Sequence, residues 1–194
     1  GGHEIGQILG QRLHMPVYDK DMLEIAAAEF DVPPEVIEKK EQRMIYSFFQ
    51  NLHDENYAPL TGADSKESRL KKVQQEVVRR MAAKEPCIIV GRLASYYLRN
   101  QPGCFHVFVH GDKAYRIRHF REENNMERNA AIQELERRDL ERNRHYKFYT
   151  GMEYGEYHNY HLSIDSSVYG SIQTADIIQD AAERYFAQYS SSAS

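Results

Sequence analysis

Arginine is concentrated in one stretch of this 194-residue chain. Half of the sixteen arginines fall between Arg116 and Arg144, among seven acidic residues. The planar guanidinium of arginine matches the oxygens of phosphates and carboxylates, so the stretch could bind a phosphate-bearing ligand. Asp139, Arg142 and Tyr146 have the spacing of one helix face. The alternative is a solvated helix with ion pairs four residues apart, such as Glu134 with Arg138.

Polar residues follow three apolar runs that have the length of buried strands. The runs are residues 15–18, 87–90 and 105–109. Asp19 follows the first, Arg92 follows the second after Gly91, and Arg116 comes soon after the third. The carboxyl ends of parallel strands meet at one edge of a sheet, where ligands bind. Asp19 could instead cap a helix and Arg92 could pair with a surface acid, but all three together favour an anionic ligand.

Gly1 and Gly2 precede a segment in which apolar residues recur at helical spacing. A glycine pair before a helix suits a phosphate-binding loop, because backbone N–H groups and the helix dipole face the anion. A leading glycine pair is equally compatible with a remnant of a purification tag.

The elements that must position these residues alternate along the chain. Strands are expected at 15–18, 87–90, 105–109 and 162–164, and helices at 5–13, 22–30, 33–49, 70–84, 93–99, 113–121, 126–146 and 172–188. Such alternation predicts an α/β fold with a parallel sheet. The tyrosine-rich residues 146–160 are expected to form an ordered loop, which could pack on the sheet or stack on a ligand ring.

Composition restricts the function further. The net charge of −4 argues against a generic nucleic-acid or anionic-membrane binder, and no apolar run has the length of a membrane span. Cys87 and Cys104 are the only cysteines and are expected to be core residues of a cytoplasmic protein. His158 and His161 could form half of a metal site, but no third ligand is evident and no side chain is assigned to a metal.

Five segments, in this order, resemble the cytidylate kinase-like family, relatives of the P-loop nucleoside monophosphate kinases. They are GGHEIG at 1–6, PVYDK at 16–20, CIIVGR at 87–92, DLERNRHYKFYTG at 139–151 and LSIDSS at 162–167. The resemblance implies a five-stranded parallel sheet with helices on both faces. It places the first strand in about ten residues before Gly1, by analogy with other doubly wound folds. It also implies a single domain over 1–189, with a helical insert at about 31–68, a lid at about 121–131 and a disordered tail at 190–194.

The resemblance also implies roles for individual residues. The donor phosphates would lie against Gly1, Gly2, His3, Glu4 and Ile5. The acceptor would lie against Tyr18, Asp19 and Arg92, and Arg116, Asp139 and Arg142 would act on the transferred phosphoryl group. ATP with Mg²⁺ would be the donor.

The sequence departs from the usual pattern of this superfamily at three places. The first nineteen residues contain no lysine, and Gly2 stands where the phosphate-loop lysine would be. Leu93 follows Arg92 where cytidylate kinases have an aspartate, and residues 21–30 contain no arginine. These departures leave the identity of the acceptor open.

The sequence therefore predicts ATP-dependent phosphoryl transfer to a nucleoside monophosphate, with CMP or dCMP as the first choice. A nucleotide-binding protein with little transfer activity, or a kinase of a small molecule other than a nucleotide, is the alternative. The expected partners are small-molecule nucleotides, with neither nucleic acid nor membrane.

Overall fold

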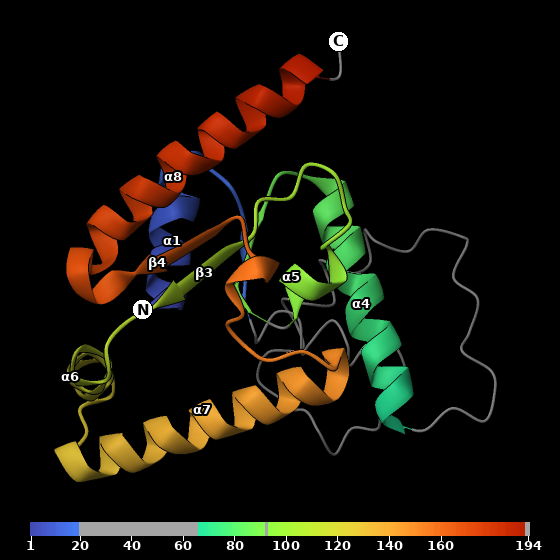
Figure 1. The fold of residues 1–194 in the computed structure, drawn as a ribbon. Coiled ribbons are helices and arrows are strands. Elements are labelled where there is room, and N and C mark those ends of the chain that lie inside the picture. Colours follow the sequence, from blue (N-terminus) through green and yellow to red (C-terminus); the bar gives the residue numbers. More distant parts are fainter. Residues whose placement is uncertain (20–65, 92, 193–194) are drawn as a thin grey trace, which may run out of the picture. The chain divides into compact units, whose positions relative to one another are not determined.

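The computed structural model describes residues 1–19, 66–91 and 93–192 (Figure 1). The chain divides into two compact units. One unit comprises Gly1–Met15 with Leu98–Ser194, and the other comprises Pro16–Tyr97.

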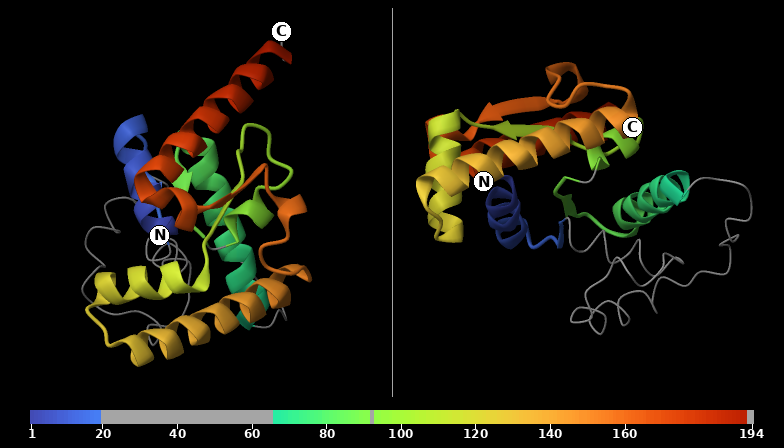
Figure 2. Two further views of the ribbon diagram at one scale, coloured as in Figure 1. Left: turned by 60° about the vertical axis from the view of Figure 1, so that its left-hand side comes forward. Right: turned by 90° about the horizontal axis from the view of Figure 1, so that it is seen from below.

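A parallel strand pair forms the centre of the first unit. β3 (Val107–His110) pairs with β4 (Leu162–Asp165), and the register aligns Val107 with Leu162 and His110 with Asp165. The predicted parallel arrangement is therefore confirmed for these two strands. Helix α8 (Ser166–Ser192) follows β4 directly and packs against α1 (Gly2–Leu13), which lies beside it in the left view of Figure 2. Apolar side chains of both helices and of β4 are buried in this layer, and they are Ile5, Leu9, Ile164, Ala175 and Ile178.

Two helices follow β3 and form a helix–turn–helix hairpin, in which α6 (Lys113–Asn124) is seen nearly end-on in Figure 1 while α7 (Arg128–Thr150) runs across the view. α6 begins at Asp112, whose carboxylate accepts a hydrogen bond from the Tyr115 amide at 2.8 Å. It ends at Asn125, which adopts the left-handed conformation, and α7 then packs against it. Ile117 and Phe120 of α6 and Ala131 and Leu135 of α7 are buried apolar residues of this hairpin. The region predicted as a lid, 121–131, spans the hairpin turn.

The segment between α7 and β4 packs its rings on β3. Phe108 of β3 contacts the rings of Tyr154 and Tyr160, with centroids 5.4 and 5.0 Å apart. Gly155 has a φ of 82°, and a Cβ there would lie 2.8 Å from the Phe108 ring. Only glycine fits this close approach. Tyr154 and Tyr160 therefore pack on the strand pair, as one of the two interpretations of the tyrosine-rich segment predicted.

The second unit is smaller in its described part. β1 (Val17–Tyr18) pairs in parallel with β2 (Ile88–Ile89), and α4 (Lys66–Lys84) packs near the short helix α5 (Ala94–Tyr97). Val77, Val78 and Met81 of α4 are buried.

The structure differs from the sequence expectations in several boundaries. Among the described residues the four strands form two separate pairs, so one continuous sheet is not observed. α7 continues to Thr150, where Gly151 caps it in the left-handed conformation. α8 starts six residues earlier than expected and has a break at Gly170. The last helix includes residues up to Ser192, within the predicted tail. The expected helices at 22–30 and 33–49 lie outside the described residues.

None of the helices in the described part of the chain is long and apolar enough to span a bilayer.

Candidate functional site

The three predicted catalytic residues lie together. The carboxylate oxygen Oδ1 of Asp139 accepts a hydrogen bond from Arg116 at 2.6 Å and another from Arg142 at 3.1 Å. We call these three residues the inner group. Two guanidinium groups share one carboxylate, so one positive charge remains. The side chains are 32%, 33% and 47% exposed for Arg116, Asp139 and Arg142, so solvent and small ligands can reach them.

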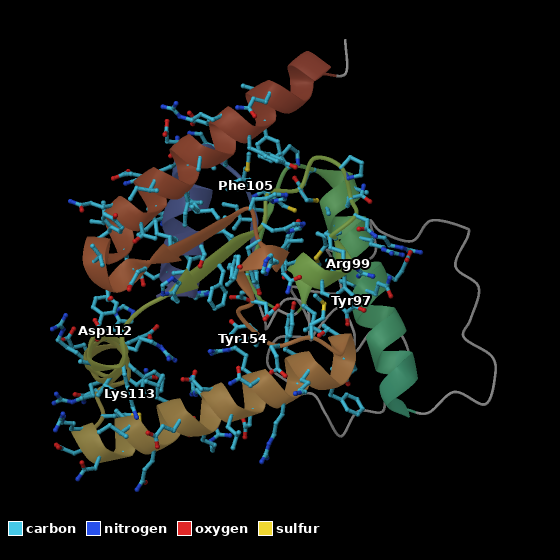
Figure 3. All side chains as sticks on the ribbon, viewed as in Figure 1. Tyr97, Arg99, Phe105, Asp112, Lys113 and Tyr154 are labelled. Atoms are coloured by element: carbon cyan, nitrogen blue, oxygen red, sulfur yellow. The ribbon has the colours of Figure 1, made fainter. Side chains whose placement is uncertain are left out.

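The hairpin explains why these residues meet. Asp139 and Arg142 are three residues apart on α7 and therefore share a face. Arg116 reaches them from the first turn of α6, whose start is fixed by the Asp112 cap. Beside this pair, Lys113 of α6 contacts Glu136 of α7 at 2.6 Å. Figure 3 shows Asp112 and Lys113 at the start of α6.

Tyr154 flanks the inner group and was not predicted as part of it. The Arg142 guanidinium lies over its ring, 5.7 Å from the centroid. Burial raises the pKa of the Tyr154 hydroxyl. The nearby charges of Arg142 and Arg116 lower this pKa, and the charge of Asp139 raises it. Tyr154 also packs on Phe108, so it links the arginines to β3 (Figure 3). The sequence gives no spacing signal for this contact.

The first turn of α1 is the second part of the site. The opening amides of an α-helix have no acceptor within the helix, and here the cap is Gly1, which has no side chain to supply one. The amides of Gly2, His3 and Glu4 therefore stand at the positive end of a 12-residue helix. The Ile5 amide is already used, because it donates to the Gly1 carbonyl at 2.9 Å, and its side chain is only 2% exposed.

The two parts of the site belong to the same unit and lie near each other. Gly1 lies within electrostatic range of Arg116 and Arg142, and of the acids Glu4 and Glu123. The start of α1 is marked N in Figure 1 and lies at the carboxyl end of β3. This is the edge of a parallel strand pair where ligands bind.

Two turns at this edge are held by hydrogen bonds. Ser166 donates from Oγ to the carbonyl of His110 at 2.8 Å, and a Cβ on Gly1 would lie 3.9 Å from the same Oγ. Asp165 accepts from the amide of Ser167 at 2.9 Å and from its hydroxyl at 2.5 Å, and these bonds lower the pKa of Asp165. The Asp112 amide donates to the Ser167 hydroxyl at 3.2 Å. The start of α1 therefore lies beside turns after β3 and β4 whose conformation is fixed by hydrogen bonds.

A second set of charged residues on α7 is arranged differently. Glu134 contacts Arg137 and Arg138, both at 2.7 Å, and Arg137 also contacts Glu141. We call these four residues the outer group. Two acids and two arginines cancel in charge, and Arg137 is 54% exposed. The solvated-helix interpretation therefore describes the outer group, including the pair of Glu134 with Arg138.

The predicted acceptor residues belong to the other unit. Tyr18 is buried, and its hydroxyl donates to Glu85 at 3.1 Å. Burial, together with this bond, raises the pKa of Tyr18 to about 12, so the phenol stays protonated. Asp19 follows β1 and is partly exposed. Arg92 lies outside the described residues.

Metal ligands do not cluster in the described ranges 1–19, 66–91 and 93–192, where no three His, Cys, Asp or Glu side chains are placed to hold an ion. His161 accepts from the His106 amide at 2.9 Å through Nδ1 and stacks on Phe105, whereas His158 stacks on Tyr157.

Comparison with known proteins identifies the family. The sequence profile of the cytidylate kinase-like family matches residues 1–168, so the chain belongs to this family. A search among curated proteins found no significant match. The fold is similar to the crystal structure of an uncharacterized protein from Eubacterium ventriosum ATCC 27560, with a TM-score of 0.70 and 22% sequence identity. That alignment covers 95% of this chain and 92% of the other.

Proposed function

We propose that the protein transfers a phosphoryl group from ATP to a small phosphate-bearing acceptor, with a nucleoside monophosphate such as CMP or dCMP as the first candidate. Membership in the cytidylate kinase-like family supports this class of reaction. The single observation that carries the proposal is the inner group, which keeps a net positive charge close to the first turn of α1.

The chemistry fits this arrangement. Phosphoryl transfer depends on positioning and on neutralising the charge of the equatorial oxygens, more than on covalent participation of the protein. The amides of Gly2, His3 and Glu4 would hold the donor phosphates. Arg142 and Arg116 would neutralise the transferred group, and Asp139 would orient both guanidiniums. Mg²⁺ would enter with the nucleotide and supply further charge neutralisation when bound.

We assign the acceptor-binding role to Asp19, Arg92 and Tyr18 of the second unit. Its Tyr18 hydroxyl is neutral at physiological pH and already donates to Glu85, so it would serve by packing. Asp19 would bind a hydroxyl or amino group of the acceptor, and Arg92 would bind its phosphate.

A second function has one observation in its favour. The first nineteen residues contain no lysine, although P-loop enzymes use one to contact the β- and γ-phosphates. A protein that binds ATP but transfers slowly or not at all would need no such group. Retention of the whole inner group favours transfer.

The test is a turnover assay with the full chain, ATP and Mg²⁺ against CMP, dCMP, UMP, AMP and GMP. We expect ADP formation that depends on one of these acceptors. Saturable ATP binding without acceptor-dependent ADP would favour the nucleotide-binding alternative or a kinase of another small molecule. Absence of ATP binding would contradict both.

A further inference from the structure

Glu4 occupies an unusual position for an acid, because it lies in the turn whose amides are proposed to bind phosphate. Its carboxylate oxygen Oε2 accepts a hydrogen bond from the Ser171 hydroxyl at 2.5 Å. The same oxygen lies 3.5 Å from Nε2 of His119. The two partners come from α8 and α6, so the carboxylate is held by two helices other than its own.

The position of Glu4 in α1 gives this carboxylate a competing partner. Gly1 is the cap of the helix, so Glu4 is its third helical residue. A glutamate there commonly folds back to accept a hydrogen bond from the amide of the cap residue, in the arrangement known as a capping box. The positive end of the helix also attracts it. A carboxylate in that place would occupy the site of an anionic ligand and repel it.

The two partners are themselves held in place. The ring of His119 stacks on Tyr115 one turn earlier in α6, at 5.9 Å and nearly parallel. Ser171 follows the break in α8 at Gly170, which has a φ of 71° and therefore favours glycine. The break interrupts the helical path immediately before the serine that reaches Glu4.

We infer that His119 and Ser171 are positioning residues that draw the Glu4 carboxylate away from the first-turn amides and so keep the phosphate site open. This inference rests on the proposed function, because it assigns a role toward the same phosphates. Glu4 then serves the site through its amide, while its side chain fastens α1 to α6 and α8.

The test measures the affinity of the full chain for ATP and for pyrophosphate by calorimetry. In the variant His119→Ala/Ser171→Ala the carboxylate is free to fold back, and we expect affinity for both ligands to fall about fivefold, the size of a lost helix-cap interaction. In Glu4→Ala the competitor is gone, and we expect affinity equal to or above that of the wild type.

The decisive variant combines all three substitutions. Glu4→Ala/His119→Ala/Ser171→Ala should bind both ligands as well as Glu4→Ala does, because no carboxylate remains to be held. A purely structural role for His119 and Ser171 would leave the loss in place. His158→Ala, which removes a histidine stacked on Tyr157, is the matched control and should bind like the wild type.

Each outcome is decisive. Unchanged affinity in His119→Ala/Ser171→Ala, or a loss that persists in the triple variant, would overturn the inference and leave the proposed function standing. Failure of the wild type to bind either ligand would overturn the proposed function, and the inference with it.

Discussion

The inner group, which joins α6 to α7, and the outer group on α7 both combine arginines with acids, yet they differ in charge balance. The inner group joins two arginines to one aspartate and keeps one positive charge. The outer group joins two arginines to two glutamates and keeps none. Ion pairs with glutamates therefore neutralise the outer arginines, whereas the inner arginines keep positive charge that can bind an anion. The number of acids around an arginine indicates its role better than its place in an arginine-rich stretch.

The environments of the two groups also differ. Arg137 and Glu141 of the outer group face solvent, where ion pairs contribute little to stability, whereas the Arg138 guanidinium lies over the Phe120 ring. Hydrogen bonds from Arg137 and Arg138 nevertheless lower the pKa of Glu134 to about 2. The inner group lies beside Tyr154 and within electrostatic range of Gly1, so a phosphate held there would be partly shielded from water.

The largest expected effect is on kcat, and it appears when one arginine is removed from the inner group but not when one is removed from the outer group. Arg142→Ala should lower kcat by about 10³-fold, because an arginine that neutralises a transferring phosphoryl group acts mainly in the transition state. Arg137→Ala, the matched control, should change kcat by less than about twofold. The measurement is steady-state ADP formation with the acceptor that the turnover panel identifies.

Thermal unfolding of the same two variants separates catalysis from stability. Both should lose less than about 1 kcal/mol, since both ion pairs are at least partly exposed. A large fall in Tm with unchanged kcat in Arg142→Ala would make that arginine structural and remove the distinction between the groups.

The sequence predicted only part of the inner group, because it indicates contacts between residues close in the chain but not contacts between distant segments. The spacing of Asp139 and Arg142 placed both on one helix face, because that relation is local. Arg116 was named as a companion from its position after a strand, but its bond to Asp139 requires the turn at Asn125. Tyr154, His119 and Ser171 were not predicted, because their contacts join segments far apart in the chain.

Element boundaries show the same limit. The strands and helices were predicted from apolar runs and periodicity, and their order is observed wherever the structure describes them. The end of α7 was placed too early because its aromatic last turn was assigned to the following loop, whereas Gly151 ends the helix. Ser166, the first residue of α8, was not recognised as a helix start, because the break at Gly170 separates it from the periodic segment.

A smaller effect concerns pH and the outer group. The pKa of Glu134 is lowered in the folded state from 4.5 to about 2, so its ion pairs stabilise the fold above pH 4.5. That contribution is lost as pH falls from about 4.5 to about 2. The wild type should therefore be more stable than Glu134→Gln at pH 7, and the difference in Tm should shrink across this window. High salt should also reduce it. A difference in Tm that stays constant with pH would show that the charge of Glu134 contributes nothing.

The most direct test of the central claim compares two variants that each remove two arginines. Arg116→Ala/Arg142→Ala removes both arginines of the inner group. Arg137→Ala/Arg138→Ala removes both arginines of the outer group. Each lowers the net charge by two, so nonspecific attraction of ATP changes equally. Calorimetric titration with Mg²⁺ and ATP should give an affinity at least about tenfold weaker for the first variant, as expected for lost charge-assisted hydrogen bonds, and within about twofold of wild type for the second. Equal affinities in the two variants would contradict the assignment of the phosphate site to the inner group.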